Sequence, residues 1–191
     1  MKLKTSKTEI RDILKAWIAI SVAFAILLSK GIFSTSFSTT FLIATLTVGL
    51  GFLIHELSHK ITAQHFHYSA EFRANNTMLL LAIAMSFFGF ILAAPGAVII
   101  KAYNITKRKN GIISLAGPLS NIILAIIFLI IPLQIFPTYG ILISTYGVLI
   151  NSWLAVFNLI PILNLDGKKI LNWDKRVYFI TLIVAISLLF L

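Results

Sequence analysis

The sequence contains no cysteine and only six acidic residues among 191 positions, and charged residues make up only 12% of it. The absence of cysteine excludes disulfides and thiolate metal sites. With 59% hydrophobic residues and a mean hydropathy of +0.97, too little polar surface remains to cover an ordinary soluble domain. The chain is therefore expected to be an integral membrane protein.

Long apolar runs predict an all-α polytopic membrane protein with about five spans, at 13–28, 41–66, 111–131, 140–167 and 176–191. Fifteen of the sixteen basic residues, all except Lys30, share one side if the apolar stretch 78–100 does not cross the membrane. By the positive-inside rule that side, which includes the N-terminus, is cytoplasmic. The formal charge of +10 is thus explained by basic residues on the cytoplasmic side of the membrane, and no nucleic-acid partner is expected.

The segment at about 70–100 is expected to be re-entrant, as a membrane-embedded irregular or β-hairpin segment between the second and third spans. Gly89, Pro95 and Gly96 interrupt it. Irregular backbone at membrane depth survives only where protein or a cavity satisfies it, so this segment should line a cavity. An ordinary sixth span is the alternative.

The whole chain, 1–191, is predicted to form one membrane-embedded domain in the lipid bilayer of the cell membrane. The spans 41–66, 111–131 and 140–167 would form its core, with 13–28 and 176–191 at the periphery. The first span also has the basic start and apolar middle of a signal peptide. No small-residue cleavage pattern follows it in LLSKGIFS, so a retained span is expected.

The second span contains HELSH at 55–59. Placing ionisable groups inside a membrane costs free energy, so such groups usually have a function. His55 and His59 lie one helical turn apart on one face and can share a metal ion. Glu56 projects ~100° away from His55 and can reach a water without being a ligand. This chemistry suits one zinc ion, which lowers the pKa of a bound water to about 7. His55 lies ~21 Å from Phe41 along the helix, so the site should lie within the membrane, nearer the cytoplasmic face.

Two histidines need a third protein ligand, and Asp166 is the carboxylate expected to supply it. Glu9 and Asp12 precede the first span, where a solvated or headgroup position explains them, and Glu71 is a weaker candidate. His65 has metzincin-like spacing, but a threonine occupies the position where that pattern needs glycine. Asp166 follows the fourth span on the same side as the end of the second.

Three motifs in order make the chain resemble the site-2 protease family of intramembrane zinc metalloproteases, peptidase family M50. HELSH matches the HExxH motif, GPLSN at 117–121 is similar to GPxxN, and NLIPILNLDG at 158–167 is similar to NxxPxxxLDG. The resemblance implies that His55, His59 and Asp166 bind zinc and that Glu56 is the catalytic base.

The resemblance also implies that Asn121 and Asn158 lie near the active site. Their amides could donate to substrate or to a developing oxyanion, and hydrogen bonding between helices is the alternative. Gly117 would allow close helix packing and Pro118 a local bend.

The expected function is hydrolysis of peptide bonds of membrane-spanning protein substrates within the bilayer, as in regulated intramembrane proteolysis. An exposed strand edge in 70–100 could hold an unwound substrate by β-augmentation. No PDZ- or CBS-type domain is present, so a separate regulatory membrane protein could act instead. The alternatives are a membrane zinc transporter or metal-binding protein, another HExxH peptidase, and an inert relative that only binds partners.

Overall fold

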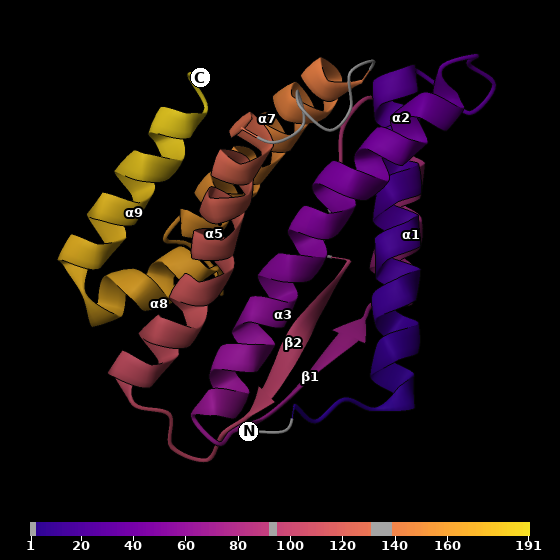
Figure 1. Ribbon diagram of the computed structural model, residues 1–191. Coiled ribbons are helices and arrows are strands. Elements are labelled where there is room, and N and C mark those ends of the chain that lie inside the picture. Colours follow the sequence, from indigo (N-terminus) through magenta and orange to yellow (C-terminus); the bar gives the residue numbers. More distant parts are fainter. Residues whose placement is uncertain (1–2, 92–94, 131–138) are drawn as a thin grey trace.

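The computed structural model describes residues 3–91, 95–130 and 139–191 (Figure 1). The N-terminal half contains α1 (Lys7–Ser29), α2 (Phe37–Ala44), the π-helical turn η1 (Thr45–Gly49), α3 (Leu50–His65), β1 (Ser69–Ala74) and α4 (Asn76–Ser86). The second half contains β2 (Gly96–Lys101), α5 (Lys107–Ile130), α7 (Gly140–Leu159), α8 (Asp166–Trp173) and α9 (Lys175–Leu188). The expected multi-pass helical architecture is present, with a small sheet added to it.

Four helices are long and apolar enough to span a membrane: Lys7–Ser29, the continuous helix Phe37–His65, Lys107–Ile130 and Gly140–Leu159. The expected fifth span corresponds to α9, whose 14 residues cover only ~21 Å of a hydrocarbon core of ~30 Å. The count of five spans is therefore not confirmed. The expected end of the third span, residue 131, lies outside the described residues.

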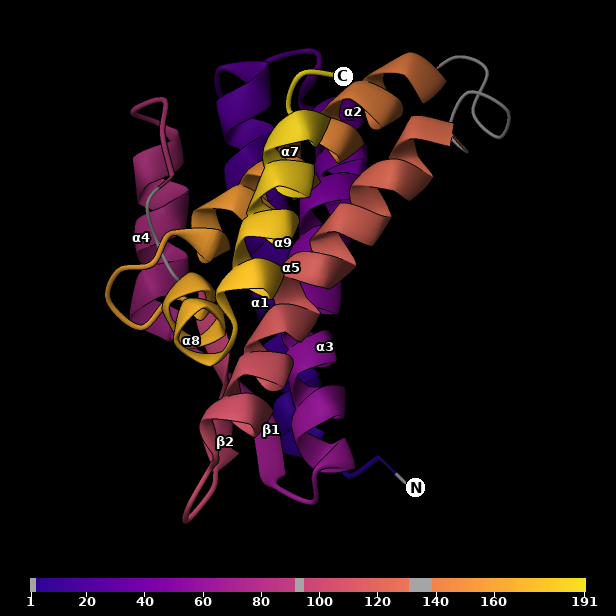
Figure 2. The same cartoon turned by 90° about the vertical axis from the view of Figure 1, so that its left-hand side faces the viewer.

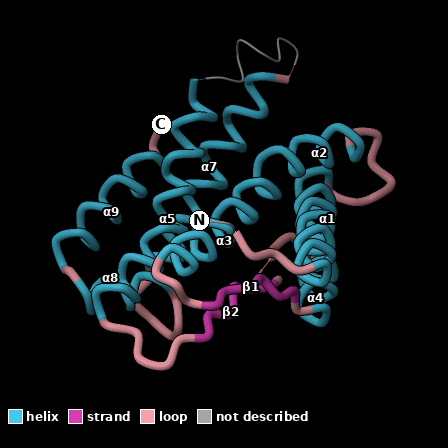
Figure 3. Tube along the Cα trace, turned by 60° about the horizontal axis from the view of Figure 1, so that its bottom comes forward, coloured by secondary structure: helices cyan, strands magenta, loops and turns pink. Residues whose placement is uncertain are grey.

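The segment 70–100 is a strand, a helix and a strand. β1 and β2 pair in antiparallel register from Ser69 opposite Lys101 to Ala74 opposite Gly96, so the segment begins and ends at neighbouring positions. The two strands run beside the lower half of α3 in Figure 1 (see also Figure 3). Between the strands α4 packs along α1, and its 11 residues are too short to cross a membrane alone. The helix between the strands distinguishes this segment from the expected β-hairpin. Residues 92–94, also part of it, lie outside the described range.

Helix α5 is the central packing element, in contact with α3, α7 and α8 (Figure 2). Side chains from α5, α7, α8 and α9 form one apolar cluster, which includes Ile122, Leu159 and Ile170. A second cluster joins α1 to η1 and α7 through Ile20, Val48 and Ile150. α3 itself contacts α5 and both strands of the sheet.

The second span contains a π turn just before its polar stretch. A π turn adds a residue to the helix and shifts the hydrogen-bond ladder locally. Here the carbonyl of Thr45 accepts a hydrogen bond from the Trp17 indole of α1, 3.2 Å away. Gly49 lies so close to Trp17 that a Cβ would come 2.7 Å from the ring. The π turn therefore fixes α3 against α1 above the site.

Candidate metal centre and the adjacent glutamate

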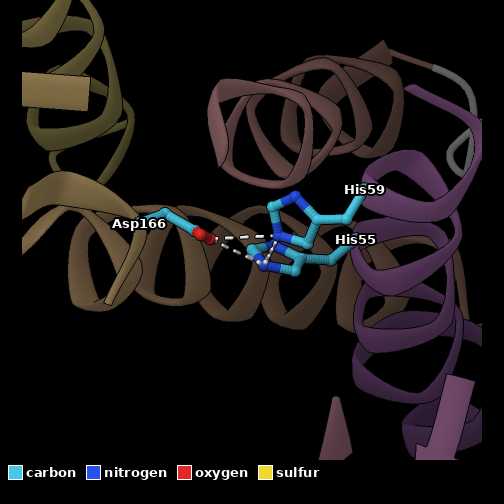
Figure 4. A group of neighbouring side chains, drawn as sticks. All are labelled: His55, His59 and Asp166. Carbon is cyan, nitrogen blue, oxygen red and sulfur yellow. Dashed lines mark hydrogen bonds and ion pairs between the residues drawn. The ribbon is translucent and has the colours of Figure 1, made fainter. Parts of the chain in front are cut away.

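His55, His59 and Asp166 meet inside the protein, although α3 and α8 are far apart in the sequence (Figure 4). The Nε2 atoms of the two histidines lie 3.0 Å apart. The Oδ2 atom of Asp166 lies 3.4 Å from Nε2 of His55 and 3.0 Å from Nε2 of His59. All three residues are buried. The residues expected to form the metal site are thus the ones that the fold brings together.

Asp166 reaches the histidines because α7 ends before the predicted end of the fourth span at residue 167. α7 ends at Leu159, and Asp166 is the first residue of the separate helix α8, not the end of a longer fourth span. Gly167 packs against the carbonyl of Leu159, where any side chain would collide with backbone. Lys169, one turn along α8, lies 3.6 Å from Oδ1 of Asp166, while Oδ2 faces the histidines.

The other ring nitrogens of the two histidines face carbonyl oxygens. Nδ1 of His55 lies 2.6 Å from Oδ1 of Asn121, and Nδ1 of His59 lies 2.7 Å from the carbonyl oxygen of Ile113, both on α5. Because a carbonyl oxygen only accepts, each Nδ1 donates to it, which leaves Nε2 as the ring nitrogen that could bind a metal. This is the arrangement in which histidine binds a metal and is oriented by a second partner.

The donor set fits zinc. Two imidazole nitrogens and one carboxylate oxygen are preferred zinc ligands, and catalytic zinc sites use three protein ligands with one position open. The three ligand atoms lie within 4.8 Å of one another. That spacing allows one ion to reach all of them at zinc–ligand distances of ~2.0–2.2 Å.

Gly117 explains why α5 can lie directly against the two imidazoles. A Cβ at this position would lie 2.6 Å from Nε2 of His55 and would also collide with Nε2 of His59. Four residues later, Asn121 accepts from His55 on the same face of α5. The GPLSN motif therefore supplies the space for the histidines and the oxygen that orients one of them.

Glu56 lies beside the group formed by His55, His59 and Asp166, and it is hydrogen-bonded to the sheet. Its Oε2 atom accepts a hydrogen bond of 2.9 Å from the backbone N–H of Val98 in β2. It is partly buried and is not a member of the three-residue ligand group. A carboxylate next to the ligands but outside the coordination set is placed to exchange a proton with a water molecule.

The two candidate amides differ in their surroundings. Asn121 is fully buried, and its Nδ2 donates to the carbonyl of Gly51 and to Oδ1 of Asn151, so both amide hydrogens are used within the protein. Asn158 donates to the carbonyl of Leu154 in its own helix. In this structure, hydrogen bonding between helices thus describes Asn121 more closely than donation to a substrate does.

Asn151 is a site residue that sequence reasoning missed. It is fully buried on α7 and connects Asn121 to the carbonyl of Gly147. A hydrogen-bonded chain thus runs from His55 on α3 through α5 to α7. The available signal was an amide within the apolar run YGVLINSWLAVF, where polar groups are costly without a partner.

The weaker ligand candidates lie elsewhere. Glu71, on β1, is paired with Arg73 at 2.8 Å and accepts a hydrogen bond from the Ser6 hydroxyl. The Ser6 hydrogen bond, with Arg73 beside it, lowers the pKa of the Glu71 carboxyl. His65 is exposed at the end of α3, next to the ring of Phe66.

The interpretation of Glu9 as a solvated or headgroup residue is wrong. Glu9 is fully buried, with its Oε2 atom 2.7 Å from Nζ of Lys60 on α3. Asp12 is also mostly buried, with a side-chain oxygen 3.8 Å from Arg73. Lys60 and Arg73 belong to elements that only the fold brings to α1, whereas Asp12 also lies 3.9 Å from Lys15 of its own helix.

Comparison with known proteins gives a relative whose name refers to zinc. The chain is 39% identical over 182 residues to a protein of Methanocaldococcus jannaschii named "Putative zinc metalloprotease". The aligned region covers 94% of this chain and 91% of the relative. No protein-family model matches the sequence, and no solved structure matches the chain. With this identity over nearly the full length, the chain belongs to the zinc metalloprotease family represented by the archaeal protein.

Proposed function

We propose that the protein is an intramembrane zinc endopeptidase that hydrolyses peptide bonds of membrane-spanning proteins within the bilayer. The observation that carries this proposal is a buried zinc-type ligand set, two histidines of which lie with an adjacent glutamate on a helix of 29 residues that is apolar enough to span a membrane. His55 lies ten residues before the end of this helix at His65, ~15 Å along its axis. The reactive groups would therefore act inside the membrane, nearer the end that carries the sheet.

Zinc bound by His55, His59 and Asp166 would polarise a carbonyl and lower the pKa of a water molecule to about 7. Glu56 would accept a proton from the attacking water and pass it to the leaving amine. The Val98 N–H would keep the Glu56 carboxylate directed toward the site. Asn121 and Ile113 would keep both Nε2 atoms available for the metal, because each accepts a hydrogen bond from the Nδ1–H of one histidine.

The outer edge of β2 supports a route for substrate binding. In the pair Phe72–Val98, the N–H of Val98 points away from β1 and toward Glu56. Backbone groups two residues away along a strand point to the same side, so those of Gly96 and Ile100 also face outward from the ladder. The Val98 N–H is already used by Glu56, so an unwound substrate segment would pair with the backbone groups of Gly96 or Ile100 and present its peptide bonds beside Glu56. A helical segment would hide the same bonds in its own hydrogen bonds.

The site residues suggest where regulation would act. A protease of this kind must limit the entry of membrane segments, and the β1–α4–β2 segment is the element next to Glu56 that an entering substrate would meet. We propose that the protein takes part in regulated intramembrane proteolysis in the cell membrane, with its N-terminus in the cytoplasm. A separate membrane protein would control access to the site.

The decisive experiment is a cleavage assay in proteoliposomes with a single-pass membrane protein as substrate. Glu56→Gln should retain stoichiometric zinc and lose cleavage, because the amide cannot accept a proton. Glu71→Gln is the matched control, since it makes the same change on β1 outside the ligand cluster, and it should cleave. Full activity of Glu56→Gln would disprove the mechanism. Zinc flux without cleavage in the same vesicles would indicate a transporter instead.

A further inference from the structure

A buried ion pair joins the first helix to the helix that carries the metal ligands. Glu9 of α1 is completely buried, and Lys60 of α3 is 2% exposed. The Nζ atom of Lys60 lies 2.7 Å from Oε2 of Glu9 and also donates to the hydroxyl of Thr5, 2.9 Å away. A buried pair of opposite charges is costly to form unless its remaining hydrogen-bonding positions are satisfied, so the second oxygen of Glu9 needs a partner.

The second oxygen of Glu9 binds the sheet. Its Oε1 atom accepts a hydrogen bond of 2.9 Å from the backbone N–H of Phe72 in β1. Phe72 is itself almost completely buried, in a cluster with Ala16 of α1 and Leu79 of α4. One carboxylate therefore connects α1, α3 and β1.

The sheet links Glu9 to Glu56, the proposed catalytic base. Phe72 lies directly opposite Val98 in the ladder, and the N–H of Val98 donates to Glu56. The two N–H groups point to opposite edges of the sheet, each toward a glutamate, as expected of a pair that exchanges no hydrogen bonds. Glu56 and Lys60 are four residues apart and lie on the same face of α3. The sheet is thus fixed to that face at two points.

We propose that Glu9 is a positioning residue for Glu56. By accepting the Phe72 N–H while paired with Lys60, it holds the sheet against α3 at the position where Val98 can bind the Glu56 carboxylate. This inference rests on the proposed function in one respect, namely that Glu56 is the base. It assigns Glu9 no contact with substrate or metal, and the metal ligands lie on α3 and α8, apart from the sheet.

Two double variants separate the hydrogen bond from the charge. Glu9→Gln with Lys60→Met removes both charges but keeps a side-chain oxygen for the Phe72 N–H. Glu9→Leu with Lys60→Met also removes both charges and leaves that N–H without its acceptor. Neither variant leaves a buried charge unpaired, so the two differ chiefly in the bond to β1. Each would be measured for zinc content, thermal stability, kcat and KM, and for hydrogen exchange of peptides that contain Phe72 and Val98.

The variant with Glu9→Leu and Lys60→Met (Leu/Met) should retain stoichiometric zinc. Its kcat should be at least tenfold lower than that of the variant with Glu9→Gln and Lys60→Met (Gln/Met), with KM within twofold. The amide hydrogens of its Val98 peptide should also exchange faster. Equal kcat and equal exchange in the two variants would overturn the proposal, as would loss of zinc in the Leu/Met variant, because that would indicate general unfolding. If the wild type cleaves no substrate, the proposed function fails. The exchange comparison then still decides whether Glu9 positions the sheet.

Discussion

Replacement of Gly117 by alanine tests whether α5 must lie against His55 and His59, the two proposed histidine ligands. The added Cβ would lie 2.6 Å from Nε2 of His55, roughly 0.9 Å closer than the ~3.5 Å at which such atoms attract. Metal–ligand distances are held to within about 0.2 Å, so a displacement of this size cannot be absorbed by the ligand set. We expect zinc affinity to fall at least tenfold and cleavage to fall with it.

The matched control is Gly147→Ala, which adds the same methyl group to α7. Its Cβ would collide with the ring of Phe128 on α5, away from the ligands. Both substitutions should cost about 1–3 kcal/mol of stability through overpacking, but only Gly117→Ala should weaken zinc binding. Zinc affinity is measured by competition with a chromophoric chelator in detergent, and stability by thermal unfolding. Unchanged zinc affinity in a folded Gly117→Ala protein would refute the packing argument.

Three further predictions concern the residues around the site. Asn121→Leu removes the acceptor for the His55 Nδ1 proton and should weaken zinc binding ~10–100-fold, whereas Asn121→Asp should weaken it less; equal affinities in a chelator titration would contradict this role. Asp166→Ala should lose stoichiometric zinc by metal analysis, and Asp174→Ala, which changes the capping residue of α9, should keep it; zinc retained in Asp166→Ala would remove the third ligand. Lys60→Met should destabilise the protein by about 3–5 kcal/mol, because Glu9 is left buried and unpaired, and addition of Glu9→Gln should recover much of this loss; additive losses in thermal unfolding would argue against a coupled pair.

The sequence by itself determined those features that depend on local spacing. The membrane class follows from hydropathy, and the pairing of His55 with His59 follows from the helical period. The choice of Asp166 followed from the scarcity of acidic residues, since the few others had competing explanations. Of the three predicted breaker residues Gly89, Pro95 and Gly96, the two glycines coincide with changes of structure. Gly89 follows the end of α4 at Ser86 and adopts φ +86°, and β2 begins at Gly96.

Tertiary structure alone decided the partners of each polar group. The sequence places Glu9 among basic residues before an apolar run, and that pattern is equally typical of a solvated helix end. Burial against α3 and β1 makes it half of an ion pair. Asn151 and Asn158 are likewise both amides on α7, and only the packing of α5 selects Asn151 as the partner of Asn121. Helical spacing indicates which face a side chain shares, but the identity of the opposing element depends on long-range packing of the whole chain.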